Sequence, residues 1–180
     1  MLKKVVIIGP ESTGKSTLCK QLADHYKMPK VDEYAREYLE TNGKEYTYLD
    51  LLKIAKGQIE NEEDIINKTK GDISSSTVFI DTDLYVIKVW SEFVFNKCDN
   101  VVLNNIAKRE YDLYLLCNTD LPWEADELRE YPDLYTRNKL YHFYKDAMIN
   151  QNTNWSEISG NYNERFESAV KAVDKLLLNL

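Results

Sequence analysis

The sequence has few cysteines, and none of them belongs to a motif. Cys19, Cys98 and Cys117 lie far apart, with no C-x-x-C pair among them. Zinc sites and thiol redox sites use closely spaced cysteines, so this spacing argues against both kinds of site. We expect buried free thiols in a protein of the reducing cytoplasm.

Positive charge and long apolar runs are also scarce. There are 23 lysines and arginines against 30 aspartates and glutamates, which gives a formal net charge of −7. Nucleic acids and anionic membranes bind to basic faces, so we expect neither as a partner. No apolar run reaches membrane-spanning length, and the opening MLKKVVIIGP is too short for a signal peptide. Any anionic ligand must therefore be held by a local group of donors.

Five short apolar runs divide the 180 residues. They are KVVIIG, KVDEY, VFID, DLYLLC and NWSEIS, at 4–9, 30–34, 78–81, 112–117 and 154–159. Most are rich in β-branched or aromatic residues, and the segments between them are long enough for helices. This alternation predicts a single α/β domain over 1–180, built on a parallel sheet.

Helical periodicity marks several of the intervening segments. Apolar residues recur in three stripes: Leu18, Leu22 and Tyr26; Val86, Val89, Trp90, Phe93 and Val94; and Leu140, Phe143, Tyr144, Ala147 and Met148. A further helix is predicted from Asn163 to the end of the chain, and composition predicts a loop at 68–76. Because Trp90 belongs to such a stripe, we assign it to the core rather than to a ligand.

The segment GPESTGKST, from Gly9 to Thr17, fits the pattern G-x-x-x-x-G-K-[ST] between an apolar run and a predicted helix. Backbone N–H groups of such a loop wrap a β-phosphate, Lys15 adds charge at the β- and γ-phosphates, and Ser16 would hold Mg²⁺. The predicted cofactors are therefore ATP and Mg²⁺. The predicted nucleotide-binding residues are Gly9, Glu11, Ser12, Thr13, Gly14, Lys15, Ser16 and Thr17.

Three carboxylates follow predicted strands. In VFIDTDLY, Asp81 ends the strand and is predicted to hold Mg²⁺ through water. Asp83, two residues later, either faces the same crevice and orients an acceptor or caps the next helix. Glu33 lies near the carboxyl end of its strand, where open α/β sheets bind ligands. It either accepts a proton from a substrate hydroxyl or stabilises a helix N-terminus.

Two segments after the later strands suggest further contacts to nucleotide. The acidic, aromatic stretch 120–137 carries Arg129 and Arg137 and is predicted to be a lid whose arginines reach the transferred phosphoryl group. Arg129 has an alternative interpretation as an exposed intrahelical pair with an acid such as Asp126. In SGNYNER, Asn161 either packs against an adenine ring or serves ordinary turn chemistry.

Together these segments resemble a known family. GPESTGKSTL, EYAREY, FIDTDLY, DLPWEADELR and ISGNYNERF are similar to the nicotinamide riboside kinase family, the kinase domain of the bacterial regulator of NAD biosynthesis. The resemblance covers nearly the whole chain. It implies a three-layer P-loop kinase fold with strand order 2-3-1-4-5, helices on both faces and a lid. The implied reaction transfers the ATP γ-phosphate to the 5′-hydroxyl of nicotinamide riboside. The larger regulator's DNA-binding and adenylyltransferase functions do not carry over.

The nicotinamide ring of this acceptor is a pyridinium cation, which aromatic faces attract by about 0.5–2 kcal/mol. Trp123, Tyr34 and Tyr38 are candidates to face it, with Arg36 and Asp83 as further acceptor contacts. Gln58 is a candidate for the carboxamide, although an exposed helical glutamine needs no such role. The predicted catalytic residues are Lys15, Glu33, Arg129 and Arg137. The alternatives are a nucleoside or deoxynucleoside kinase and a nucleotide-binding regulatory ATPase module, and the oligomeric state stays open.

Overall fold

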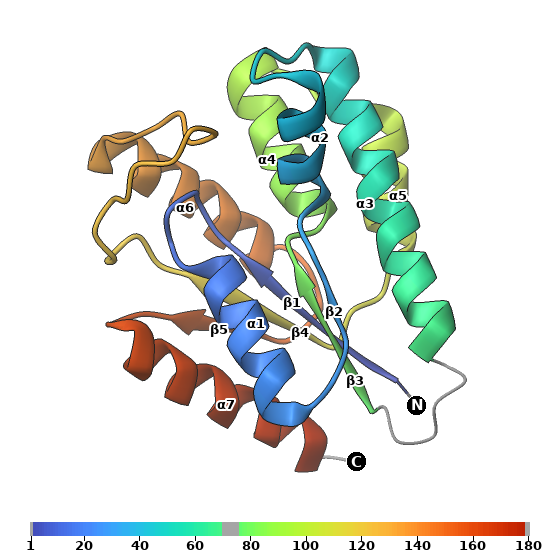
Figure 1. Cartoon of the computed structure of the whole chain (residues 1–180), viewed down its shortest axis with the longest axis vertical. Helices are drawn as coiled ribbons and strands as arrows, with labels where there is room; N and C mark the ends of the chain where they lie inside the picture. The colour runs from blue at the N-terminus through green and yellow to red at the C-terminus, as the bar shows by residue number, and fades with distance from the viewer. Residues whose placement is uncertain (1, 70–75, 179–180) are drawn as a thin grey trace.

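Five parallel strands form one sheet. The structure is a computed structural model that describes residues 2–69 and 76–178. The strands are β1 (Lys3–Ile8), β2 (Lys30–Val31), β3 (Thr77–Asp81), β4 (Leu113–Cys117) and β5 (Trp155–Ile158). Their order across the sheet is β2-β3-β1-β4-β5, and every neighbouring pair is parallel (Figure 1). The predicted fold class and strand order are confirmed.

The side chains of β1 alternate between two cores. Val5 and Ile7 pack under one helical layer, while Val6 and Ile8 pack under the other, and all four are fully buried. Successive side chains of a strand point to opposite faces, so a sheet covered on both sides needs apolar residues at every position. This is why the apolar run has no polar alternation.

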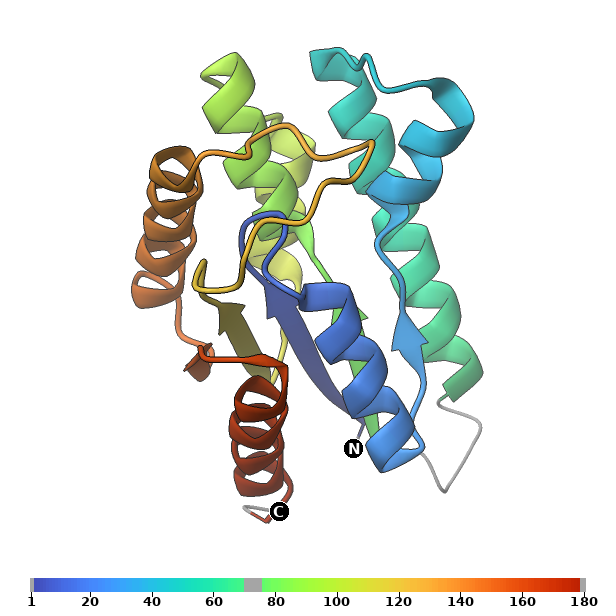
Figure 2. The same cartoon turned by 60° about the vertical axis from the view of Figure 1, so that its left-hand side comes forward.

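Helices cover both faces of the sheet. On the first face lie α1 (Lys15–Tyr26) and α7 (Tyr162–Leu178), as Figures 1 and 2 show. The other helices are α2 (Tyr34–Asn42), α3 (Tyr48–Thr69), α4 (Leu84–Phe95), α5 (Asn100–Lys108) and α6 (Leu134–Ile149). Of these, α4 and α6 contribute Val89, Leu140, Tyr144 and Met148 to the core on the second face.

A third apolar cluster joins α2 to α3 and α4, beyond the edge of the sheet. It contains Ala35, Ile54 and Leu84, with Tyr34 and Trp90 packed against it. Gly57 in α3 allows this approach, because a Cβ at that position would overlap the ring of Tyr34. The cluster fixes α2, and therefore the residue that precedes it, relative to the sheet.

Several sequence expectations need correction. The run at 30–34 is a strand only at Lys30–Val31, and Tyr34 already begins α2. Phe143 is 43% exposed, so the core stripe of α6 is Leu140, Tyr144, Ala147 and Met148 without it. In the loop predicted at 68–76, Lys68 and Thr69 form the end of α3, while 70–75 lie outside the described residues.

The three cysteines are free thiols, with Cys19 and Cys117 buried and Cys98 half-buried. Burial raises the pKa of the Cys19 thiol well above its ordinary value, which makes it a poor nucleophile. Over the described ranges, no helix combines the length and the apolar character that a membrane crossing requires.

Candidate active site

The loop between β1 and α1 approaches other backbone closely. Gly9 has φ +142°, and a Cβ there would lie 2.6 Å from the carbonyl oxygen of Cys117 on β4. Gly14 has φ +77° and caps α1. Because only glycine adopts these conformations at low cost, the two glycines give the loop its shape above the carboxyl ends of the strands. The N–H groups that open α1 remain directed at the loop, as in an anion site.

Lys15 lies across the mouth of this loop. Its Nζ donates a hydrogen bond to the carbonyl oxygen of Pro10 at 2.9 Å, and the hydroxyl of Thr13 donates to the same oxygen at 2.7 Å. The ammonium group therefore already lies where a phosphate chain bound by the loop would pass.

Asp81 is a buried carboxylate with a free oxygen. It ends β3 beside β1, it is 3% exposed, and its Oδ1 has no hydrogen-bond partner among the described residues. Burial and the nearby charge of Glu33 raise the pKa of Asp81 to about 7, which is the behaviour of a carboxylate whose charge lacks a cation. The charge of Lys15 and the hydroxyl of Ser16 act on this carboxyl group and lower its pKa.

The residues present therefore fit Mg²⁺. A hydroxyl and an unpartnered carboxylate oxygen are the ligand types that Mg²⁺ takes when phosphates and water complete its shell. A cage made by the protein alone is not expected here, and the described residues contain no group of three or more His, Cys, Asp or Glu that could hold a metal.

Glu33 immediately precedes α2 and lines the same pocket as Lys15 and Ser16. Its side chain makes no capping hydrogen bond to α2. Its charge raises the pKa of Asp81 and of Arg36, so it lies within electrostatic range of both side chains. The structure thus brings Glu33, Lys15, Ser16 and Asp81 together, as the sequence suggests.

The structure does not bring Asp83 into the pocket. Asp83 is 2% exposed, caps α4 by accepting from the backbone N–H of Tyr85 at 2.9 Å, and accepts from the hydroxyl of Tyr114 at 2.7 Å. Thr82 between the two aspartates has φ +65°. In a regular strand, the side chains of residues 81 and 83 would point to the same face. The left-handed backbone of Thr82 interrupts this alternation, so the two carboxylates point in different directions. Of the two interpretations, the structure matches helix capping.

Gln58 is also a structural residue. It is 2% exposed, accepts from the backbone N–H of Tyr34 at 2.8 Å and donates to the carbonyl oxygen of Thr82 at 3.3 Å. It ties the start of α2 to the turn after β3. It is therefore neither an exposed helical residue nor a pocket contact.

The lid predicted at 120–137 is a loop at 118–133 followed by the first turn of α6. In Figure 2 this loop, in yellow and orange, passes across the phosphate loop toward α2 and α3 before returning to α6. Arg137 lies in α6, is 2% exposed, and donates to the carbonyl oxygens of Ser12 and Leu121 at 3.0 and 3.4 Å. It anchors the base of the lid to the phosphate loop.

Arg129 lies in the lid itself. It donates to the hydroxyl of Ser12 at 3.3 Å and to the carbonyl oxygen of Glu124. The ring of Trp123 lies against both guanidinium groups. Its centroid is 5.9 Å from the guanidinium carbon of Arg129 and 5.6 Å from that of Arg137. The suggested pair of Arg129 with Asp126 does not form, because the Asp126 carboxylate accepts from Arg36 at 3.0 Å instead.

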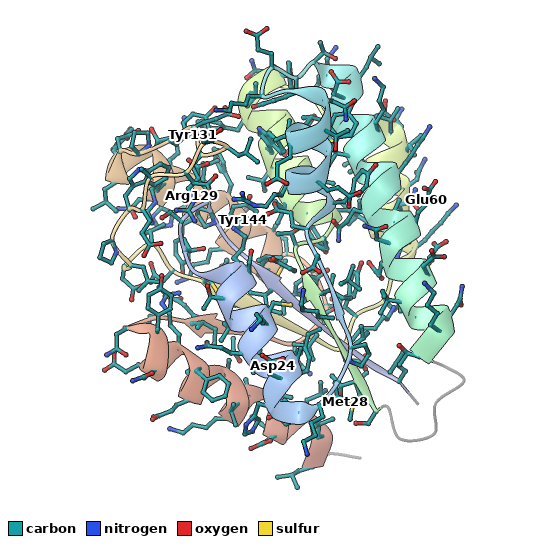
Figure 3. The ribbon with its side chains drawn as sticks, viewed as in Figure 1. Asp24, Met28, Glu60, Arg129, Tyr131 and Tyr144 are labelled. Atoms are coloured by element: carbon teal, nitrogen blue, oxygen red, sulfur yellow. The ribbon has the colours of Figure 1, made fainter. Side chains whose placement is uncertain are left out.

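Beyond the phosphate loop, the pocket has an apolar and aromatic wall. Its members come from α2, α4, α6 and the lid: Ala35, Leu39, Val86, Trp90, Phe93, Leu128, Tyr131, Leu140 and Tyr144. Arg129 and Tyr131 from the lid and Tyr144 from α6, all labelled in Figure 3, line this pocket. Trp90, assigned to the core from its sequence, is thus also a wall residue.

The three aromatic residues predicted to face the acceptor are elsewhere. Trp123 stacks on the arginines, Tyr34 packs on Gly57, and the hydroxyl of Tyr38 donates to Asp50 at 2.7 Å. None of them lines the described pocket, whereas Arg36 does. The apolar stripe of α4 was the sequence feature that could have indicated the pocket wall, because one helix face can contribute to both the core and a pocket.

At the turn after β5, the structure matches ordinary turn chemistry for Asn161 rather than the predicted nucleotide contact. Asn161 accepts from the N–H groups of Asn163 and Glu164 at 3.0 and 3.1 Å, and Glu164 accepts from the N–H of Asn161 at 2.8 Å. This reciprocal capping box leaves Asn161 outside the pocket. Its neighbour Tyr162 lines the pocket beside Gly14.

Arg165 is a positioning residue that sequence reasoning missed. Although it is 2% exposed, it donates to the carbonyl oxygens of Thr13 at 3.1 Å, Asn118 at 2.9 Å and Gly160 at 2.8 Å, and it pairs with Asp120. It joins the phosphate loop to the loops after β4 and β5. A single arginine in a polar helical stretch carries no sequence signal for this role.

A parallel sheet in this order, a phosphate loop after β1 and an acidic end to β3 define a P-loop kinase-like fold. The family model described as "AAA domain" (AAA_28) matches residues 4–165, and the chain belongs to that family. It is homologous to the trifunctional NAD biosynthesis/regulator protein NadR of Escherichia coli and of Salmonella typhimurium. Each is 26% identical over 181 residues, which is 98% of this chain and 43% of the relative. The chain thus spans less than half the length of these relatives.

Solved structures give the same result. A structure of NadR protein in complex with NR matches 97% of this chain and 49% of its own, with a TM-score of 0.77 and 25% identity. Thymidylate kinase from Ehrlichia chaffeensis matches 96% and 98%, with a TM-score of 0.69 and 12% identity, and so supports the fold alone. The resemblance inferred from the sequence is therefore confirmed.

Proposed function

We propose that the protein transfers the γ-phosphate of ATP to the 5′-hydroxyl of nicotinamide riboside and so forms nicotinamide mononucleotide. The observation that carries the proposal is the match to NadR over nearly the whole chain, including a structure described as a complex with NR. A related NadR structure is described as a complex with NAD and AMP-PNP, an ATP analogue, which supports ATP as the donor.

In the proposed reaction, the phosphate loop holds the triphosphate and Lys15 contacts the β- and γ-phosphates. Ser16 and Asp81 would hold Mg²⁺, which neutralises charge that develops on the phosphates during transfer. Arg129 lies in the lid above Ser12, from where it can reach the γ-phosphate. Arg137 is buried against backbone carbonyls, so we assign it to holding the loop rather than to contacting phosphate.

Glu33 is the proposed base. It lies in the pocket between the phosphate loop and the aromatic wall, so an acceptor hydroxyl directed at the γ-phosphate passes it. A positioned base contributes typically 10²–10⁴-fold in rate. Because phosphoryl transfer has a loose transition state, part of this effect is orientation of the hydroxyl rather than removal of its proton.

The acceptor ring is proposed to lie against the aromatic wall. Trp90, Phe93 and Tyr144 offer ring surface, and Glu33 adds negative charge to the lining of the same pocket. A pyridinium ring gains from both, whereas a neutral pyrimidine gains only from stacking. This is the physical argument for nicotinamide riboside over uridine or thymidine.

Product identification tests the proposal. The purified protein is incubated with ATP, Mg²⁺ and, separately, nicotinamide riboside, uridine, thymidine and deoxyadenosine, and the products are identified by mass spectrometry. We expect nicotinamide mononucleotide as the preferred product. Preferred phosphorylation of thymidine or deoxyadenosine would indicate a deoxynucleoside kinase. ATP hydrolysis with no acceptor phosphorylated would indicate a regulatory ATPase module.

A further inference from the structure

Glu11 occupies a variable position of the phosphate loop, yet its carboxylate binds the lid. Its Oε2 accepts from the backbone N–H of Glu130 at 3.0 Å, and its Oε1 accepts from the backbone N–H of Tyr131. Burial raises the pKa of Glu11, while these two N–H groups and the Lys15 charge lower it. The lid backbone therefore supplies donors that a carboxylate in this position needs.

The two bonds lie next to the functional residues of the lid. Arg129 directly precedes Glu130, and its guanidinium lies 3.3 Å from the Ser12 hydroxyl. Leu128 and Tyr131, on either side, belong to the wall of the pocket. Because the peptide units at 130 and 131 are held, the arginine and the wall residues have one position relative to the phosphate loop.

The next loop residue holds the other end of the lid. The hydroxyl of Ser12 accepts from the backbone N–H of Glu124 at 3.0 Å. Two consecutive side chains of the phosphate loop thus tie the lid at two points six residues or more apart. Further lid residues bind the other side of the pocket: Asp126 pairs with Arg36 at 3.0 Å, Glu127 pairs with Lys44 at 3.1 Å, and Glu130 accepts from the Tyr46 hydroxyl at 3.1 Å. Glu124 also accepts from the hydroxyl of Tyr162 at 3.3 Å.

We propose that Glu11 is a lid-positioning residue: its carboxylate holds the Glu130–Tyr131 backbone so that Arg129 lies over the phosphate loop and Tyr131 closes the acceptor wall. The expected effect of Glu11 on catalysis rests on the proposed function, whereas its contact with the lid backbone does not depend on that function. It differs from the nucleotide contact that the loop motif suggests for this position. A loop that binds phosphate also sets the lid that covers it.

Hydrogen exchange measured by mass spectrometry tests the contact without any substrate. Glu11→Gln replaces one acceptor oxygen with an NH₂ group that faces an N–H donor, and Glu11→Ala removes both acceptors. We expect exchange at the amides of Glu130 and Tyr131 to rise about tenfold or more, because two charge-assisted hydrogen bonds are lost or weakened. Glu11→Gln preserves the side-chain volume and decides the question if Glu11→Ala does not fold.

Glu127→Gln is the matched control, since it removes one carboxylate from the same lid without touching the phosphate loop. Its exchange at positions 130 and 131 is expected to match that of the parent protein. Unchanged exchange in folded Glu11 variants, or an equal rise in the Glu127 control, overturns the proposal.

Kinetics separate positioning from direct contact. Loss of lid position should lower kcat through Arg129 and raise the acceptor KM through Tyr131, together with the faster exchange. A rise in KM with exchange unchanged would assign Glu11 to the acceptor instead and overturn the proposal. If the parent protein phosphorylates no acceptor, the proposed function fails, while the exchange measurement still decides the role of Glu11 in the lid.

Discussion

At the scale of single residues, Trp90 and Trp123 have different surroundings. The indole of Trp90 lies in the pocket wall, and its Nε1–H donates to the hydroxyl of Tyr46 at 2.7 Å. Trp123 lies against Arg129 and Arg137. The two rings should therefore affect different kinetic constants, because one lies in the wall proposed to hold the acceptor ring and the other packs against two arginines proposed to act at or near the phosphate loop.

We expect Trp90→Ala to reduce the preference for nicotinamide riboside over uridine by about 0.5–2 kcal/mol, measured as the ratio of their kcat/KM values. Trp90→Phe keeps an aromatic face and should retain most of the preference. Trp123→Ala should instead lower kcat for both acceptors alike. If Trp123→Ala narrows the preference and Trp90→Ala does not, the acceptor ring lies against the lid and not against α4.

At the scale of elements, the position of α2 depends on one glycine. Gly57 lies in the middle of α3, where glycine is about 1 kcal/mol less favourable than alanine. It lies at a helix–helix contact so tight that a Cβ would overlap the Tyr34 ring. Since Glu33 directly precedes Tyr34 and α2, this contact sets the distance of the proposed base from the phosphate loop.

We expect Gly57→Ala to destabilise the protein by about 1–3 kcal/mol, despite the better helix propensity of alanine, because the ring of Tyr34 must move. Turnover should fall as well, since Glu33 moves with α2. Thermal unfolding and steady-state kinetics of Gly57→Ala, Tyr34→Ala and the double variant check this expectation. The double variant should recover part of the loss relative to the sum of the single variants. If the losses of the two single variants simply add in the double variant, the Gly57–Tyr34 contact does not determine the position of α2.

At the scale of the whole molecule, buried carboxyl groups make stability depend on pH. Burial raises the pKa of Asp83 from an ordinary 3.8 to about 7, and it also raises the pKa of Asp81 and of Glu62. Between about pH 4 and pH 7, the folded protein therefore binds more protons than the unfolded chain. The stability that this contributes is fully present below about pH 4 and is lost as the pH rises through about 7.

We expect the Tm of the ligand-free protein to fall between pH 5 and pH 8. Asp83→Asn keeps an acceptor for the Tyr85 N–H and removes the buried charge, so it should flatten this profile and stabilise the protein at pH 8 by about 1–3 kcal/mol. Differential scanning calorimetry of both proteins across this range is the measurement. The same slope in the variant and the parent protein would mean that Asp83 does not titrate in this range.

Local sequence determined the phosphate loop, the order of elements and the buried strands. Gly9, Gly14, Lys15 and Ser16 act within one continuous turn, so chain neighbours alone specify their chemistry. Asp81 was predictable for a related reason, since the end of a strand beside β1 must lie at the loop.

Only the tertiary structure decided which side chains share the pocket. Whether Trp90 faces core or ligand depends on how α4 is rotated against α2 and α6, which its own stripe does not specify. Asp83 turned away because Thr82 has a positive φ, and Arg165 and Glu11 acquired roles from loops more than a hundred residues away. Such contacts join distant segments, and a periodic pattern describes only one segment at a time.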